Sequence, residues 1–301
     1  MSRALKAHLL LVLVTFIWGS TFVLIKAAVQ HDISPLLFNL VRMLLATAAL
    51  ALIFRADVKA IRGPALRSGA LVGMFMWLGY EFQTTGIRHT TASKSAFITG
   101  ISVVLVPLFL SIFWRRNVNH WAVAGVACAF VGLFLLTVPA GESAFGNWTS
   151  VNAGDVLTFL CAGGFAFQII FLGRATERHS VGQIAFLQIA IAAAWMAVSI
   201  PFAPEVQHLH PSKIVIWGIL ITGLFGTAFA FSIQAWAQQF TSPTHTALIF
   251  SLEPVFAWIT SYVVLGERLG ARAGLGAMMI LAGVLISELL GGTSVPRDSK
   301  A

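Results

Sequence analysis

The chain has 301 residues, of which 58% are hydrophobic and only 10% are charged, and its formal net charge is +8. Soluble domains carry about 25% charged residues, so this composition excludes a soluble globular protein and makes the lipid bilayer its solvent. The Lys and Arg residues are scattered between apolar runs, without a basic helix or tail, which argues against binding of nucleic acid.

Ten apolar segments are each predicted to form a membrane-spanning helix, which needs roughly 20 residues. In chain order they are 8–29, 35–54, 67–87, 92–114, 120–138, 154–174, 181–202, 213–236, 243–265 and 271–290. The connections are short. Most Lys and Arg between spans fall on the side that holds both termini, which predicts cytoplasmic termini. The fold class is therefore an all-α integral membrane protein with ten transmembrane helices.

The chain also contains an internal repeat. Residues 95–117 and 246–268 align without a gap at a spacing of 151 residues. Because each half holds five spans, the second half is inverted relative to the first, as in many carriers that bind substrate between two halves. We predict two inverted five-helix repeats, 1–145 and 146–301.

Several motifs carry a family resemblance. They are FIWGSTFVLIKAA at 16–28, SLEPVFAW at 251–258, LGERL at 265–269 and AGLGAMMILAGVLI at 273–286. Together they resemble the drug/metabolite transporter superfamily and its ten-helix EamA branch, over about residues 8 to 290. The resemblance implies a bacterial inner-membrane exporter of amino acids or other small metabolites. Its substrate cavity would lie between the halves, lined by spans one, three, four, six, eight and nine.

Polar groups inside a bilayer are costly and usually face the bundle interior. Glu253 lies eight residues after His245, or about two helical turns, so both are predicted on one helix face. The repeat places Lys94 and Ser102 at the same two positions of the fourth span. We expect a polar column along a transport pathway. Glu253 contacts substrate or protons there, or it accepts hydrogen bonds from amides freed at Pro254.

Two further stripes occupy the third and eighth spans at matching helical spacing. Their members are Trp77, Glu81, Thr84 and Arg88, and Thr227, Phe231, Gln234 and Gln238. Glu81 lines the cavity or forms a buried ion pair with Arg88 or Lys94.

The first two spans carry further candidates. Trp18 and Phe22, one turn apart, line the cavity or pack against neighbouring helices. Lys26 is expected to reach the membrane interface. Arg42 and Asn39 of the second span are interpreted as structural anchors.

We therefore predict a secondary transporter that exports neutral or aromatic amino acids by alternating access, with protons as candidate coupling ions. The alternatives are an exporter of drugs, nucleosides or quaternary ammonium compounds, and a membrane-embedded enzyme. The partners are a small-molecule substrate and the bilayer, without a metal or cofactor; a monomer is expected, with a dimer as the alternative. The residues expected to contact substrate are Trp18, Phe22, Trp77, Tyr80, Glu81, Thr84, Lys94, Ser102, Gln168, Phe231, Gln234, His245 and Glu253.

Overall fold

The computed structural model describes residues 2–29, 32–86, 89, 92–138, 152–203, 208–266 and 270–290. Within these ranges the side chains of residues 22, 23, 26, 92–94, 261 and 265 are not described. The predicted boundary between the repeats, at residues 145 and 146, lies outside the described residues.

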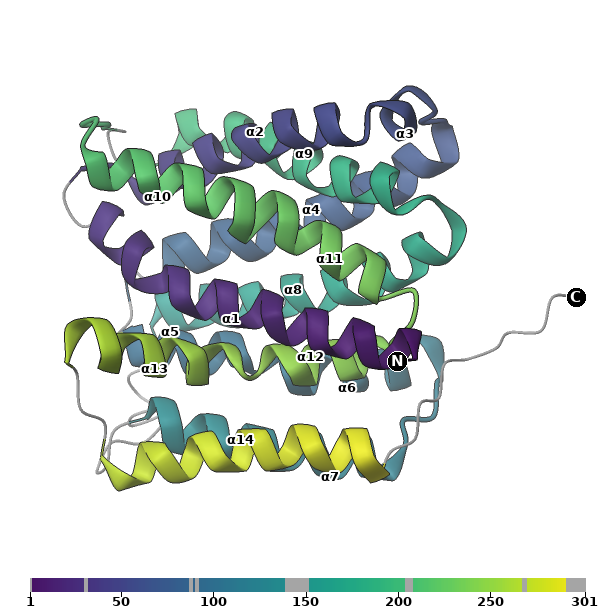
Figure 1. The fold of residues 1–301 in the computed structure, drawn as a ribbon, viewed down its shortest axis with the longest axis vertical. Helices are drawn as coiled ribbons and strands as arrows, with labels where there is room; N and C mark the ends of the chain where they lie inside the picture. The colour runs from purple at the N-terminus through teal and green to yellow at the C-terminus, as the bar shows by residue number, and fades with distance from the viewer. Residues whose placement is uncertain are drawn as a thin grey trace, which may run out of the picture.

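Helices make up nearly all of the described chain (Figure 1). The first half contains α1 (Arg3–Val29), α2 (Pro35–Ile53), α3 (Arg55–Lys59), α4 (Gly63–Gly86), α5 (Ala92–Gly100), α6 (Ser102–Trp114) and α7 (His120–Thr137). The second half contains α8 (Ala153–Arg178), α9 (Val181–Ser199), α10 (Lys213–Gly223), α11 (Ala230–Ala237), α12 (Pro243–Phe250), α13 (Glu253–Leu265) and α14 (Ala271–Leu290). Two short segments join them, the 3₁₀-helix η2 (Ile200–Phe202) and the π-helix η3 (Leu224–Phe229).

The predicted all-α membrane fold is confirmed. Nine helical segments of the described chain are long and apolar enough to cross a membrane. The remaining predicted span, 67–87, corresponds to α4, which has 24 residues and is long enough to cross. It contains the polar side chains of Arg67, Glu81 and Gln83.

Short polar side chains define where several helices begin. Ser180, Ser212 and Ser242 each accept a hydrogen bond from a backbone amide in the first turn of the helix that follows. Asn152 and Asp155 form a capping box at the start of α8. These side chains satisfy amides that have no partner within the helix, so the spans begin where the sequence places such residues.

The last spans of the two halves pack together at one edge of the bundle, α7 against α14 (Figure 1). A Cβ added to Gly125 would stand 2.5 Å from the carbonyl oxygen of Gly283, and one on Gly132 would stand 2.6 Å from that of Gly276. Gly276 and Gly283 follow Gly125 and Gly132 by the repeat spacing of 151 residues. The interface therefore relates the two halves by an approximate two-fold axis.

The fourth and ninth spans are each divided into two helices, at equivalent places. The amide of Ile101 donates to the carbonyl of Ile98 at 3.1 Å between α5 and α6. The amide of Leu252 donates to the carbonyl of Ile249 at 3.0 Å between α12 and α13, 151 residues later. Pro254 has no amide hydrogen to continue the α-helical pattern. The sequence predicted one span at each place, with a break at Pro254 as one interpretation of Glu253 and no break at Ile101.

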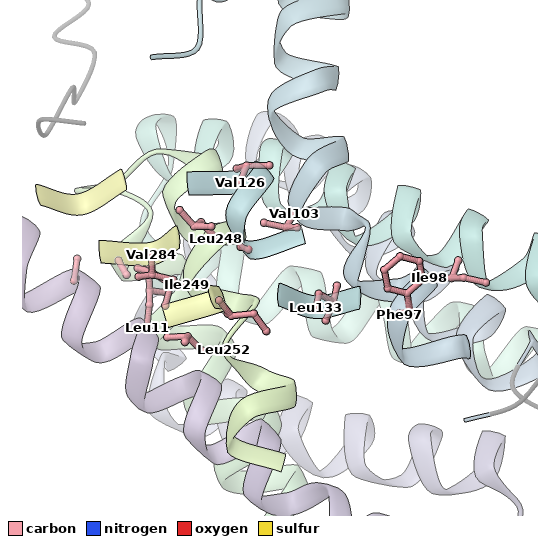
Figure 2. Packing of buried hydrophobic residues seen from close by; sticks show 14 of the residues in the cluster. Leu11, Phe97, Ile98, Val103, Val126, Leu133, Leu248, Ile249, Leu252 and Val284 are labelled. Atoms are coloured by element: carbon pink, nitrogen blue, oxygen red, sulfur yellow. The ribbon is translucent and has the colours of Figure 1, made fainter. Parts of the chain in front are cut away.

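Both interruptions lie against one buried apolar cluster, shown in Figure 2. Its labelled members come from α1, α5, α6, α7, α12 and α14, with Leu252 at the second interruption, and are Leu11, Phe97, Ile98, Val103, Val126, Leu133, Leu248, Ile249, Leu252 and Val284. Farther along the bundle, α4 packs along α8, and α10, η3 and α11 pack along α1. The third span of each half therefore packs against the first span of the other half, and side chains from both halves meet in the centre.

Candidate functional site

Trp18 of α1 connects the two halves at the centre of the bundle. Its Nε1 donates to the carbonyl oxygen of Gly226 at 2.7 Å. Gly226 belongs to the π-helix η3, and π-helical turns displace carbonyls from the regular α-helical pattern and are frequent at functional sites. The indole ring also packs against Phe231 and Phe250, with centroids 5.3 Å and 4.9 Å away. Trp18 thus belongs to a group of packed aromatic rings.

Arg42 of α2 reaches the same region and is buried. Its guanidinium carbon lies 4.8 Å from the ring centroid of Tyr80 and 6.0 Å from that of Phe38. Its Nε has no hydrogen-bond partner, and no carboxylate pairs with it among the described residues. A buried cation without a carboxylate is costly unless another anion binds, so Arg42 is suited to an anionic group of a ligand.

Glu253, the first residue of α13, is partly exposed although it lies inside the bundle. Its carboxylate forms no hydrogen bond or ion pair with the residues that the structure describes, and it lies within electrostatic range of Tyr80. At the interruption, the amides of Ser251 and Leu252 donate to carbonyls of the preceding turn. These two amides are therefore satisfied by the backbone and do not bond to the Glu253 side chain.

Two more elements contribute to this group. Thr99 of α5 contacts Cys161 of α8, with 3.8 Å between Oγ1 and Sγ, and the ring of Phe165 packs edge-on against Tyr80. We define the central site by eight residues drawn from both halves. They are Trp18, Arg42, Tyr80, Thr99, Cys161, Phe231, Phe250 and Glu253.

The side chains of the stripe predicted on α4 contact several neighbouring helices in this conformation. Trp77 stacks on Trp195 of α9 with ring centroids 5.2 Å apart. Glu81 accepts a hydrogen bond from Ser199 of α9 at 3.1 Å. Thr84 accepts one from Asn39 of α2. These three side chains face neighbouring helices, whereas Tyr80 faces the central site.

Gln168 and Gln234 lie in a buried chain of amides. Gln168 donates to Gln188 at 3.0 Å and accepts from Gln234 at 3.3 Å, and the exposed fractions of the three are 2%, 0% and 0%. The chain links α8, α9 and α11, so in this conformation these amides bind one another.

Replacing Gln168 with Leu is expected to lower the free energy of unfolding by about 1–3 kcal/mol, because it leaves two buried amide groups unpaired. Thermal unfolding of the detergent-solubilised protein measures the change. Gln239→Leu is the matched control, since Gln239 makes one hydrogen bond, to the Thr176 carbonyl, and is only partly buried. Equal stability of the two variants would contradict a stabilising role for the chain.

Other predicted residues lie elsewhere. His245 is buried near the start of α12, beside His8 and Glu288. The interruption at Ser251 and Leu252 separates it from Glu253, so the two do not share one continuous helix face as the spacing predicted. Ser102 is the first residue of α6, at the position equivalent to Glu253, and is partly buried. The side chains of Phe22, Lys26 and Lys94, and all of Arg88 and Glu267, lie outside the described residues.

Sequence reasoning left Arg42, Thr99, Cys161 and Phe250 out of the predicted site. A charge within an apolar span was the available signal for Arg42. Thr99 and Phe250 occupy equivalent positions, 151 residues apart, just before the two interruptions. Only the interruptions show that these positions face the centre.

The repeat symmetry is broken in the packing of the half-spans. α12 packs against α6, but no comparable packing joins the equivalent helices α5 and α13 in the described part of the chain. Correspondingly, Ala247 of α12 is 3% exposed, whereas the equivalent Ala96 of α5 is exposed. The N-terminus lies near the contact between α12 and α6, and α5 and α13 lie toward the other end (Figure 1). Among the described residues, the half-spans therefore pack more closely toward the N-terminal end of the bundle than toward the opposite end.

This architecture, two symmetry-related helical halves around a polar centre, defines a class of membrane transport proteins. The chain belongs to the EamA-like transporter family, whose model matches residues 5–138 and 152–289. This agrees with the resemblance to the drug/metabolite transporter superfamily.

Similar proteins support this assignment. A protein of Archaeoglobus fulgidus named an uncharacterized transporter is 35% identical over 288 residues, covering 95% of this chain and 87% of that protein. YoaV of Bacillus subtilis, also named an uncharacterized transporter, is 23% identical and covers 94% and 96% of the two chains. A solved crystal structure matches the fold with a TM-score of 0.78 at 17% identity, covering 95% and 97%. The protein is a multi-pass membrane protein of a transporter family, and these relatives point to transport and not to an enzyme.

Proposed function

We propose that the protein is a secondary transporter of neutral or aromatic amino acids or closely related zwitterions. The observation that carries the proposal is the buried guanidinium of Arg42, which has no carboxylate partner among the described residues and lies against Tyr80. A substrate carboxylate is the anion that suits this group. Glu253, also within electrostatic range of Tyr80, suits a substrate amino group, and Trp18, Phe231 and Phe250 suit an apolar or aromatic side chain.

We further propose alternating access, with export from the cytoplasm across the cell inner membrane. The excess of Lys and Arg beside the N-terminal end of the bundle, including those on α3 and at the end of α6, supports cytoplasmic termini. The closed packing of α12 against α6 then corresponds to a state closed toward the cytoplasm. In the opposite state α5 would pack against α13, exchanging the roles of the two repeats. A monomer suffices because both halves contribute to the central site, and residues 1–145 and 146–301 remain our proposal for the repeats.

Uptake by proteoliposomes tests this function. A labelled panel of neutral and aromatic amino acids, nucleosides and quaternary ammonium compounds would be offered with and without a proton gradient. Saturable uptake of zwitterionic amino acids, accelerated by unlabelled substrate on the other side, is expected. Saturable uptake confined to quaternary ammonium compounds would favour the second candidate, which Glu253 and the aromatic group around Trp18 support through cation–π contacts. No saturable uptake of any class by folded protein would contradict the proposal.

Glu253→Gln is expected to lower the uptake of a substrate with a free amino group about tenfold, because a hydrogen bond to a charged group contributes about 1.5–3 kcal/mol. An N-acetylated substrate should be affected little. The matched control is Glu81→Gln, since Glu81 lies at the contact with α9 and is bonded to Ser199. If Glu253→Gln instead retained counterflow and lost only the response to a proton gradient, Glu253 would be a proton carrier and not an amine contact.

A further inference from the structure

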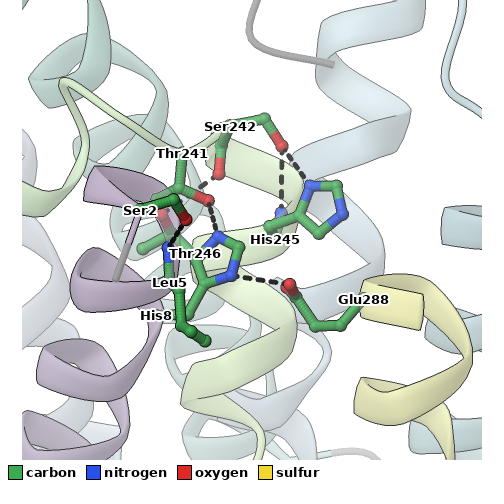
Figure 3. Close-up of polar contacts among 8 residues, drawn as sticks. All are labelled: Ser2, Leu5, His8, Thr241, Ser242, His245, Thr246 and Glu288. Atoms are coloured by element: carbon green, nitrogen blue, oxygen red, sulfur yellow. Dashed lines mark hydrogen bonds and ion pairs between the residues drawn. The ribbon is translucent and has the colours of Figure 1, made fainter. Parts of the chain in front are cut away.

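A second polar cluster lies close to the start of α1, and its polar contacts are shown in Figure 3. Three titratable side chains meet there from three spans: His8 of α1, His245 of α12 and Glu288 of α14. His8 Nδ1 lies 2.6 Å from Glu288 Oε2, and His8 Nε2 lies 2.9 Å from the hydroxyl oxygen of Thr241. His8 therefore joins the first span to the tenth span and to the turn that precedes the ninth span.

The second histidine is stacked on the first. The rings of His8 and His245 are 6.1 Å apart at an interplanar angle of 13°. His245 is 7% exposed, and the side chains of His8 and Glu288 are 13% and 20% exposed. One Oε atom of Glu288 is buried without a hydrogen-bond partner. A single proton shared by His8 and Glu288 leaves the cluster neutral, whereas a proton on each ring would place two cations face to face with one carboxylate.

The other charged groups near this cluster interact with residues outside it. On α1, the cations of Arg3 and Lys6 lie over the rings of Phe240 and Trp236. Arg174 of α8 lies over the ring of Trp114, and Cys128 of α7 donates to the carbonyl of Met279. Glu253 lies beyond the interruption that ends α12. In the described part of the structure, Glu288 is thus the carboxylate that pairs with His8 and lies within electrostatic range of His245.

The cluster is attached to the half-span that closes the N-terminal end. Ser242 caps α12 by accepting the amide hydrogen of His245 at 3.2 Å, and its hydroxyl lies 2.7 Å from Nδ1 of the same residue. A proton taken from water onto the His245 ring makes both ring nitrogens donors. The Ser242 hydroxyl must then accept from Nδ1 as well as from the amide. The charge state of His245 is therefore coupled to the start of α12, which packs against α6.

We propose that His8, His245 and Glu288 form a proton-binding site, and that binding of a second proton releases α12 from α6 and opens the N-terminal end. The inference rests on the proposed alternating access and names the site at which protons act on it. The cluster takes up the proton from water on the N-terminal side of the bundle. When the bundle changes state, the cluster releases the proton to water on the same side or on the opposite side. Repulsion between the two stacked imidazolium rings opposes the closed packing.

The test measures opening directly and needs no substrate. Position 247 is buried between α12 and α6, so Ala247→Cys reports opening through its rate of alkylation by a water-soluble maleimide, measured by peptide mass spectrometry. Gly63→Cys provides the reference rate, because Gly63 is exposed and nothing lies within 4 Å of its added Cβ. The ratio of the two rates removes the intrinsic effect of pH on thiols. Between about pH 8 and about pH 5.5, where histidine titrates, we expect the ratio to rise about fivefold or more.

His8→Gln and His245→Gln, each made separately in the reporter background, are expected to abolish this rise, because each leaves one imidazole ring and no pair of cations. His120→Gln is the matched control, because His120 is an exposed histidine at the start of α7, and it should retain the rise. Thermal unfolding shows which variants fold, and any one folded cluster variant suffices. A rise that persists in the folded cluster variants, or that His120→Gln also removes, would overturn the inference. Substrate counterflow does not enter this readout, so a failed proton site and a failed transport function give different results.

Discussion

Replacing Arg42 with Gln is expected to lower uptake of a carboxylate-bearing substrate by about 100-fold, because removing one partner of a buried charge pair costs about 2–5 kcal/mol. The guanidinium is buried against Tyr80 and finds no carboxylate among the residues that the structure describes. A bound substrate carboxylate would supply the missing anion. Glutamine keeps hydrogen-bonding capacity but not the charge.

The substrate itself provides the sharpest comparison. An amino acid and its amide differ at the group that Arg42 would bind, so the variant should lose most of the preference for the carboxylate. Arg42→Lys should give an intermediate loss, because an ammonium cannot offer two parallel hydrogen bonds. Arg272→Gln is the matched control, since the Arg272 guanidinium also lies over an aromatic ring, that of Phe134, but at the start of α14. Equal losses for the acid and the amide would show that Arg42 anchors the helices and does not bind substrate.

The sequence predicted the fold well because hydrophobicity and repeat spacing determine it directly. Apolar length placed the spans, and the spacing of 151 residues between 95–117 and 246–268 predicted the repeat. A break at Pro254 was one interpretation of Glu253, but the interruption at Ile101 and the π-helix η3 were not predicted. Each is a local change in the backbone hydrogen-bond pattern that leaves the apolar length of the span unchanged.

The candidate site was less predictable, because helical spacing predicts the face on which a side chain lies only where the helix is continuous. His245 and Glu253 were expected on one face, but the interruption between α12 and α13 separates them. Gln168 and Gln234 were expected to face a substrate, and they bind each other. The role of Arg42 depends on whether a carboxylate lies beside its guanidinium. The sequence does not show this, because the neighbours of Arg42 come from several helices.

Replacing Gly276 with Ala is expected to lower the free energy of unfolding by about 3 kcal/mol, at the upper end for overpacking. The added Cβ would stand 2.5 Å from the carbonyl oxygen of Gly132 and 2.6 Å from the amide nitrogen of Leu136. Both are backbone atoms of α7, so neither can rotate away as a side chain would. The helices α7 and α14 must separate, and the approximate two-fold contact between the halves weakens.

Gly274→Ala provides the control on the same helix, because nothing lies within 4 Å of a Cβ added there. Alanine is favoured over glycine in a helix interior by about 1 kcal/mol, so Gly274→Ala should leave stability unchanged or raise it. Thermal unfolding in detergent, followed by tryptophan fluorescence, compares the two variants with the parent protein. A fall in unfolding temperature for both variants would point to a general effect of the β-carbon on α14. A fall for Gly276→Ala alone would show that close backbone contact between the repeats stabilises the bundle.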